Sequence, residues 1–151
     1  MTELIDPWAT HIEAPWMHQA AMMLGVKEIP GAKHNPAIVQ LWRDIGRWVR
    51  DDETAYCAAG VGACLERSGY AHTGRGNARS YLDHGTACDP TYGAIAVFWR
   101  GSVDSWKGHV AFWLRADGAR VWVLGFNQGN TVSAAPYPRA RLLGTRWPEP
   151  Q

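Results

Sequence analysis

The sequence predicts an α+β domain in which helices come first and an antiparallel sheet follows. Apolar residues recur at helical spacing in the first half of the chain, and continuous or alternating apolar segments typical of strands begin at Ala94. Asp117-Gly118, between two of these segments, is a hairpin signal. Because 151 residues suffice for one domain with a real core, we expect a single catalytic domain over 1–151, with its core at about 14–147.

Four helices are expected before the sheet. Pro15 suits the first turn of the first helix, and Asn35 is a good N-cap for the second. An acidic run at 51–53 leads into the third, where it is favoured by the helix dipole. Gly60 and Gly62 inside the third helix each cost about 1 kcal/mol relative to Ala, which predicts close packing of the sheet against them. The expected ranges are 14–26, 35–49, 56–68 and 77–85.

Five strands are expected in the second half, at 94–99, 108–114, 120–125, 131–134 and 142–147. Side chains alternate between the faces of a strand, so His109, Ala111 and Trp113 share one face. We expect the third helix to pack on that face, which would bring the start of the helix to His109. The last four residues, 148–151, are expected to fray.

Composition excludes several classes of function. The net charge is +1 and no Lys/Arg block is present, so a surface that follows nucleic-acid phosphates is not expected. No segment approaches the roughly 20 apolar residues that cross a bilayer, so membrane insertion is not expected. Residues 1–8 have neither the basic nor the apolar part of a secretory signal, so we expect synthesis in the cytoplasm. Of the nine tryptophans, most are expected in the core and others along a groove.

The chain has three cysteines, an odd number that argues against a disulfide framework. Cys57 and Cys64 lie seven residues apart, which is about 10 Å along a helix and too far for a disulfide. That spacing does not suit zinc, and the histidines show no ligand spacing either. We therefore expect no metal and no cofactor. Cys64 is interpreted as packing and Cys88 as an incidental loop residue.

Cys57 stands at the expected start of the third helix, and His109 stands on a strand far downstream. A thiol attacks as the thiolate, which a helix N-terminus and a nearby imidazole both favour, so we expect a lowered pKa for Cys57. Asn127 or Gln128, after the 120–125 strand, could orient the imidazole. Taken singly, each feature has a simpler interpretation: Cys57 as inert helix packing and 127–130 as a turn.

Together these residues suit nucleophilic acyl transfer. Cys57 would attack a carbonyl, and His109 would hold the thiol proton and later give it to the leaving amine. Asn127 would fix the ring. The backbone N–H of Cys57, with a second donor, would stabilise the oxyanion.

Segments of this chain occur in an order that resembles the small papain-like cell-wall cysteine hydrolases of the NlpC and CHAP kind, most of all phage and prophage endolysin-like proteins. The segments are 56–62, 77–82, 93–98, 108–112 and 125–130, and the resemblance covers roughly 14–147. It implies a papain-like α+β fold and hydrolysis of peptidoglycan amide bonds. By motif, the nucleophile falls on Cys57, the base on His109 and the orienting residue on Asn127, with Gln128 as the other choice.

The chain departs from many such relatives at Tyr56, where they carry Trp or Asp, and at Phe126, where they carry Gly. We expect Tyr56, Trp106, Phe126 and Gln128 to contact substrate. A monomer is expected, with peptidoglycan as its partner. The resemblance implies action on the wall or periplasm, reached through a separate membrane-disrupting protein or within a phage-like particle.

Four functions are compatible with these residues. The first is an endolysin-like peptidase or amidase that cleaves the stem peptide or the sugar–peptide junction. The second is a toxin-type amidase effector with the same chemistry. The third is a non-catalytic wall- or glycan-binding module in which the tryptophans carry the function and Cys57 is structural. The fourth is acyl transfer or deubiquitinase-like activity on protein substrates.

Overall fold

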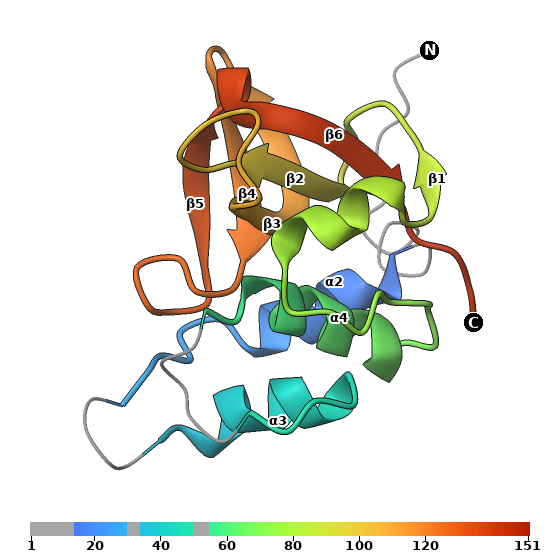
Figure 1. Ribbon diagram of the computed structural model, residues 1–151, viewed down its shortest axis with the longest axis vertical. Coiled ribbons are helices and arrows are strands. Elements are labelled where there is room, and N and C mark those ends of the chain that lie inside the picture. Colours follow the sequence, from blue (N-terminus) through green and yellow to red (C-terminus); the bar gives the residue numbers. More distant parts are fainter. Residues whose placement is uncertain (1–13, 30–33, 50–54) are drawn as a thin grey trace.

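The computed structural model describes residues 14–29, 34–49 and 55–151, and it shows the predicted α+β architecture (Figure 1). Helices precede an antiparallel sheet along the chain, and they pack below it in the view of Figure 1. The helices are α2 (Pro15–Met22), α3 (Pro36–Asp44) and α4 (Cys57–Arg67), followed by the 3-10 helix η1 (Ala78–Asp83). The acidic run at 51–53 lies outside the described residues.

Local chemistry sets the helix ends. The Asn35 side chain caps α3 by accepting a hydrogen bond from the Ala37 N–H at 2.9 Å, as predicted. The helix stops at Asp44, five residues before the expected end at 49. Gly46 follows with a left-handed φ of +81°, a conformation that ends a helix and that glycine adopts without strain. This glycine signal was missed in the sequence.

Six strands form one antiparallel sheet in the order β1-β6-β2-β3-β4-β5. The strands are β1 (Thr86–Ala87), β2 (Ile95–Trp99), β3 (Gly108–Asp117), β4 (Arg120–Gly125), β5 (Ser133–Pro138) and β6 (Leu142–Trp147). The predicted hairpin is present, with Asp117 paired to Arg120 across the turn. β5 lies later than the expected 131–134. Pro136 and Pro138 read as strand breakers, but an edge strand tolerates proline, and β5 is an edge strand.

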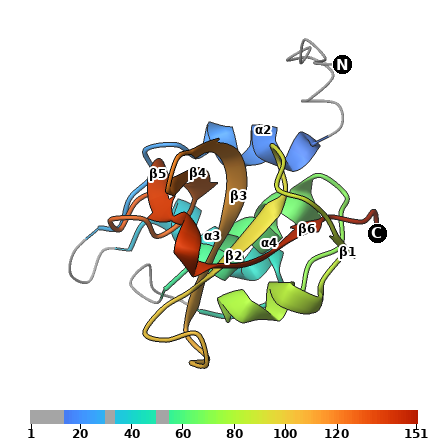
Figure 2. The ribbon, with the colours of Figure 1, turned by 90° about the horizontal axis from the view of Figure 1, so that it is seen from above.

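The sheet is strongly curved. β5 and β6 are separated by three other strands, so a flat sheet would hold them about 19 Å apart. Only the short 3-10 helix η2 (Arg139–Arg141) joins them, and the chain from Pro138 to Leu142 spans at most about 14 Å. The sheet must therefore curl to bring its two sides together, as Figures 1 and 2 show.

The two faces of the sheet bury different residues. One face packs with the helices and carries Ile95, Val97, Val110, Phe112 and Leu124. The other is the inside of the curve and carries Ala94, Ala96, Phe98, Ala111, Trp113, Val121 and Val123. Helix α4 therefore lies on the face opposite to Ala111 and Trp113. The expectation that it packs on their face was wrong, because the large Val110 and Phe112 side chains are the ones that fit the small residues of the helix.

Close packing explains the two glycines inside α4. A Cβ at Gly60 would lie 2.0 Å from the Phe126 ring, and one at Gly62 would lie 2.7 Å from Ile45. Close packing at this helix is thus confirmed, although the neighbours are Phe126, just after β4, and Ile45, just after α3, and not the sheet strands that were expected. Every residue of α4 from Cys57 to Leu65 is buried, because the helix lies between the sheet and α3 (Figure 1).

The C-terminal residues are held against the segment that follows α4, so the expectation that 148–151 frays was wrong. The Ala71 N–H donates to the Glu149 carbonyl at 2.9 Å, and the Gln151 N–H donates to the Gly69 carbonyl at 3.1 Å. Tyr70 and Pro150 form an antiparallel bridge. These backbone bonds fix the end of the described chain on the helical layer.

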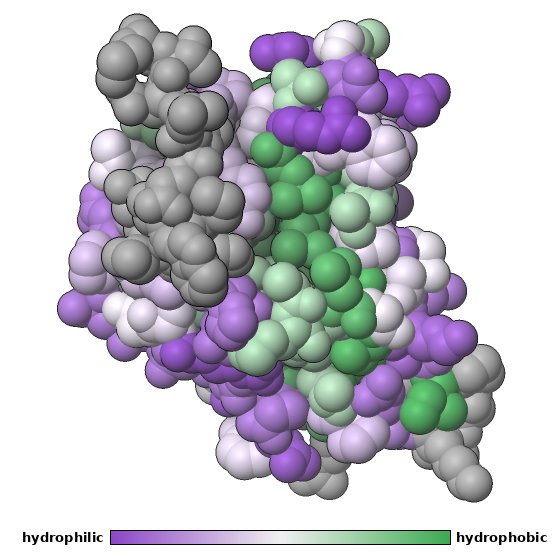
Figure 3. All heavy atoms as spheres, turned by 180° about the vertical axis from the view of Figure 1, so that it is seen from behind, coloured by the Kyte–Doolittle hydropathy of each residue, from purple (hydrophilic) through white to green (hydrophobic). Residues whose placement is uncertain are grey.

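The surface is not uniformly polar. Seen from behind, an apolar band runs down the molecule between more hydrophilic margins (Figure 3). Among the described residues, the large apolar side chains with the greatest exposure include Trp48 at 77% and Trp106 at 75%. Trp106 lies beside the site described next.

Candidate active site

Cys57 is placed where β4 separates from β3. It is the first residue of α4 and is only 6% exposed. The backbone N–H groups of Val110, Ala58 and Cys57 itself hydrogen-bond to its sulfur. Pairing between β3 and β4 begins at Phe112, which leaves the start of β3 open to the helix. Because Val110 follows His109, the sulfur lies against the backbone next to His109.

His109 is held by Gln128. Its Nε2 lies 2.9 Å from Oε1 of Gln128, and both side chains are buried. The Gln128 amide nitrogen donates to the Ser133 carbonyl at 2.7 Å. A carbonyl can only accept, so the NH₂ group faces Ser133 and Oε1 faces the ring. The proton is therefore on Nε2 of His109, and Nδ1 carries a lone pair.

The free nitrogen of His109 is the one that a base needs. Nδ1 is buried and has no hydrogen-bond partner among the described residues. It is the ring nitrogen nearer the backbone, and the next backbone N–H, that of Val110, is bonded to the Cys57 sulfur. An unpartnered buried nitrogen is costly, and in this tautomer Nδ1 has a lone pair that can accept a proton.

The ring partner is Gln128, whereas the motif favoured Asn127. Asn127 has a left-handed φ of +61°, which turns the chain so that the following side chain reaches back to the sheet. Gly125 leaves the room for this, because a Cβ there would lie 2.5 Å from Oε1 of Gln128 and 2.8 Å from Ala111. Asn127 serves the turn, and Gln128 meets the imidazole.

Tyr137 was missed by the sequence analysis. Its ring stacks on His109 with centroids 4.7 Å apart and an interplanar angle of 10°, and it also stacks on Phe98 at 5.1 Å. The imidazole is thus fixed edge-on by Gln128 and face-on by Tyr137. Tyr137 lies on β5 beyond the range expected for that strand, so its face could not be assigned from the sequence.

Burial sets the charge state of the pair. It raises the pKa of the Cys57 thiol, although three backbone N–H groups and the charge of Arg100 oppose it. Burial lowers the pKa of His109 to about 4, against the effect of the Gln128 hydrogen bond. The expected lowering of the Cys57 pKa is therefore wrong for the free protein. At neutral pH the site holds a thiol and a neutral imidazole.

A pocket of about 220 Å³ opens beside Cys57. Its walls come from Ala55 and Cys57, from residues 76–78 next to η1, and from Arg100 and residues 106–108 before β3. Trp106 stands at this pocket with its side chain largely exposed, where the sequence analysis expected a substrate contact.

Two other residues expected to contact substrate are instead in the core. The side chains of Tyr56 and Phe126 are both 0% exposed. Phe126 fills the space above Gly60 of α4. Neither lines the pocket, so the groove expected at these positions is not formed by them. Tyr56 and Phe126 were expected at the groove because they adjoin Cys57 and Asn127 in the sequence. Adjacent residues point in different directions, however, and these two point into the core.

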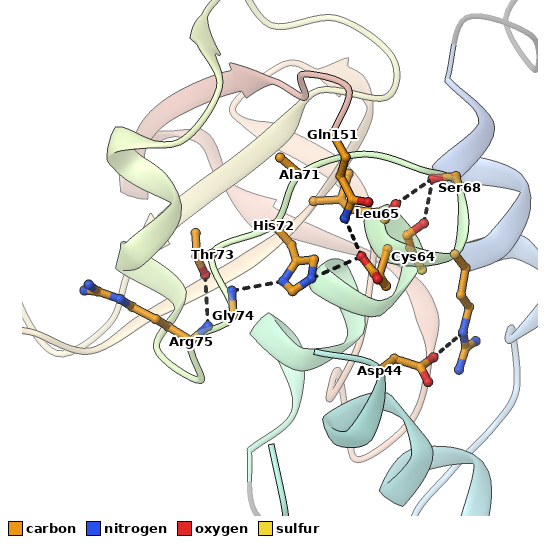
Figure 4. Close-up of polar contacts among 12 residues, drawn as sticks. Asp44, Cys64, Leu65, Ser68, Ala71, His72, Thr73, Gly74, Arg75 and Gln151 are labelled. Carbon is orange, nitrogen blue, oxygen red and sulfur yellow. Dashed lines mark hydrogen bonds and ion pairs between the residues drawn. The ribbon is translucent and has the colours of Figure 1, made fainter. Parts of the chain in front are cut away.

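Cys64 lies farther along α4 and His72 lies in the segment after the helix, and their surroundings differ from those of Cys57 and His109 (Figure 4). Both ring nitrogens of His72 are occupied: Nδ1 accepts from the Gly74 N–H at 3.0 Å, and Nε2 lies 3.4 Å from Glu66. The Gln151 side chain also donates to Glu66. Cys64 is 0% exposed, and burial raises its pKa to about 12. This cluster supports the fold.

Within the described ranges, no helix is long and apolar enough to cross a membrane. Nor do those residues bring together three or more His, Cys, Asp or Glu side chains able to hold a metal ion. No family model matches the chain, and no curated protein or solved structure matches it significantly.

Proposed function

We propose that the protein is a papain-like cysteine hydrolase that cleaves amide bonds of peptidoglycan. The observation that carries the chemistry is the buried His109 ring, with Nε2–H on Gln128 and an unpartnered Nδ1, next in the chain to Val110, whose N–H hydrogen-bonds to the Cys57 sulfur. The choice of peptidoglycan rests on the resemblance of the five ordered segments to endolysin-like proteins. We propose that it acts on the cell wall, as a lysin or as an effector with the same chemistry.

Catalysis begins from the neutral pair. As the Cys57 sulfur attacks the amide carbonyl carbon, Nδ1 of His109 takes the thiol proton, and the carbonyl π electrons move to oxygen. When the tetrahedral intermediate collapses, the C–N bond breaks and the amine leaves with that proton. A thioester remains on Cys57. Water then attacks the thioester while Nδ1 takes its proton, and the proton returns to the sulfur as the acid leaves.

The start of α4 supplies the electrostatics of this reaction. The N–H groups of Cys57 and Ala58 already donate to the sulfur, at the positive end of an eleven-residue helix. The charge that moves from sulfur to the carbonyl oxygen stays within reach of these donors. A preorganised donor of this kind contributes about 10²- to 10³-fold in rate. Tyr137 and Gln128 keep the imidazole in place throughout.

Digestion of purified peptidoglycan tests the proposal. We expect wild-type protein to release soluble fragments that mass spectrometry detects, and the new termini will identify the bond. Cys57→Ala should release at least about 1000-fold less. Cys64→Ala, a matched control on the same helix, should keep its activity. Folded wild-type protein that binds the wall but releases nothing would refute hydrolysis and favour a binding module.

A further inference from the structure

We propose that the pocket beside Cys57 binds a free carboxylate of the substrate through Arg100 and Lys107. The proposal rests on the hydrolase function above and adds a specificity to it. Both cations line the pocket, and none of its described lining residues is acidic. Within the described part of the chain, neither Arg100 nor Lys107 forms an ion pair. Two unpaired cations in one pocket are suited to an anionic ligand.

The wall that carries these cations is held rigidly. Arg79, on η1, donates to three backbone carbonyls of the loop before β3: to Lys107 at 2.7 Å, to Val103 at 2.8 Å and to Ser102 at 2.9 Å. The Arg100 N–H closes the loop by donating to the Lys107 carbonyl at 3.2 Å. A guanidinium fork with three partners fixes a loop more tightly than one hydrogen bond does. The pocket is therefore formed before substrate arrives.

Arg100 connects this pocket to the reacting groups. Its charge lowers the pKa of both Cys57 and His109, and its guanidinium hydrogen-bonds to Tyr137, the residue stacked on the imidazole. A substrate anion held by Arg100 would thus lie beside the amide that the thiol attacks. Peptidoglycan stem peptides carry free carboxylates close to their amide bonds, and the planar fork of Arg matches a carboxylate. The exposed Trp106 ring at the same pocket offers an apolar surface to the rest of the ligand.

Paired peptides test this inference. We would prepare stem peptides in which each free carboxylate in turn is converted to a carboxamide, and measure their binding to Cys57→Ala by calorimetry. One amidation should weaken binding by at least about tenfold, the size of a charge-assisted hydrogen bond. Adding Arg100→Gln and Lys107→Gln should abolish that difference. Adding Arg115→Gln, which removes an exposed arginine on β3 outside the pocket, should preserve it.

Removing Arg100 also changes the electrostatic field at Cys57. The decisive quantity is therefore the ratio of the affinities for the acid peptide and its amide, because a general electrostatic or structural effect would change both affinities equally. Equal binding of all peptides, no binding of any, or a preference that survives Arg100→Gln with Lys107→Gln would overturn the carboxylate site. The hydrolase proposal is tested separately with wild-type protein. Cleavage of acid and amide peptides at equal rates would support the hydrolase proposal and refute the carboxylate site. Selective binding of the acid peptide without cleavage by the wild-type protein would support the carboxylate site and refute the hydrolase proposal.

Discussion

Helix α4 carries two cysteines, Cys57 at its start and Cys64 farther along, and their surroundings differ. At the start of the helix, Cys57 meets backbone N–H groups, and His109 keeps one nitrogen free. Two turns farther along α4, Cys64 is fully buried in the core. Both ring nitrogens of His72 are occupied, one by the Gly74 N–H and the other by Glu66. A place at a pocket and an unpartnered histidine nitrogen distinguish the Cys57 end of the helix.

The largest expected difference between the two groups is in the histidines. His109→Ala should lower hydrolysis of peptidoglycan by at least about 1000-fold, because the thiol loses its proton acceptor. His72→Ala should change it by less than about threefold, since that ring only holds the loop after α4. Rates of fragment release by variants shown to be folded by circular dichroism provide the measurement. Similar losses in both variants would mean that the comparison between the groups is mistaken.

The next effect separates Gln128 from Asn127. Gln128→Ala should lower kcat about 10- to 100-fold, as for other partners that orient an imidazole, with little change in KM. Asn127→Gly is the matched control, because a φ of +61° suits glycine, and its activity should remain. Steady-state kinetics on a soluble stem peptide would show the split. A greater loss in Asn127→Gly would restore the assignment that the sequence motif favoured.

Protonation of His109 should appear in stability. Its pKa is about 4 when folded, against about 6.5 when unfolded, so below pH 6.5 the unfolded chain binds a proton that the folded chain does not. Stability is therefore full above about pH 6.5 and falls as the pH drops toward 4, by up to about 3 kcal/mol. Urea unfolding at pH 7.5 and pH 4.5 measures this loss. His109→Gln should show a smaller loss, and an equal loss would locate the effect in other groups.

The sequence predicts the elements of the fold better than it predicts the environment of Cys57 and His109, the pair that it proposes as catalytic. Cys57 and His109 follow from local signals, a helix start and a strand start. The position of the Gln128 side chain depends on the left-handed conformation of Asn127, which the sequence did not indicate. Tyr137 lies on an edge strand that was not predicted at that position because it contains two prolines. The pKa of Cys57 depends on burial by distant residues, which local sequence does not contain.

The surroundings of the pocket show the same limit. Arg79 follows no motif for loop binding, and its three hydrogen bonds to residues 102–107 exist only because the fold brings η1 beside β3. The face of the sheet on which α4 packs is also set by side-chain volume. Small residues along the helix accept Val110 and Phe112, and alternation along β3 alone does not say which face meets the helix.

Site-resolved alkylation tests the central claim most directly, because it needs no substrate. Folded protein is treated with iodoacetamide at pH 8, and each cysteine is followed by peptide mass spectrometry, with the partly exposed Cys88 as an internal reference. We predict that Cys57 reacts while Cys64 does not, and that His109→Ala slows Cys57 by at least about tenfold without affecting Cys88. Equal labelling of Cys57 and Cys64, or a Cys57 alkylation rate that is unchanged in His109→Ala, would contradict the proposal that Cys57 and His109 act as a pair.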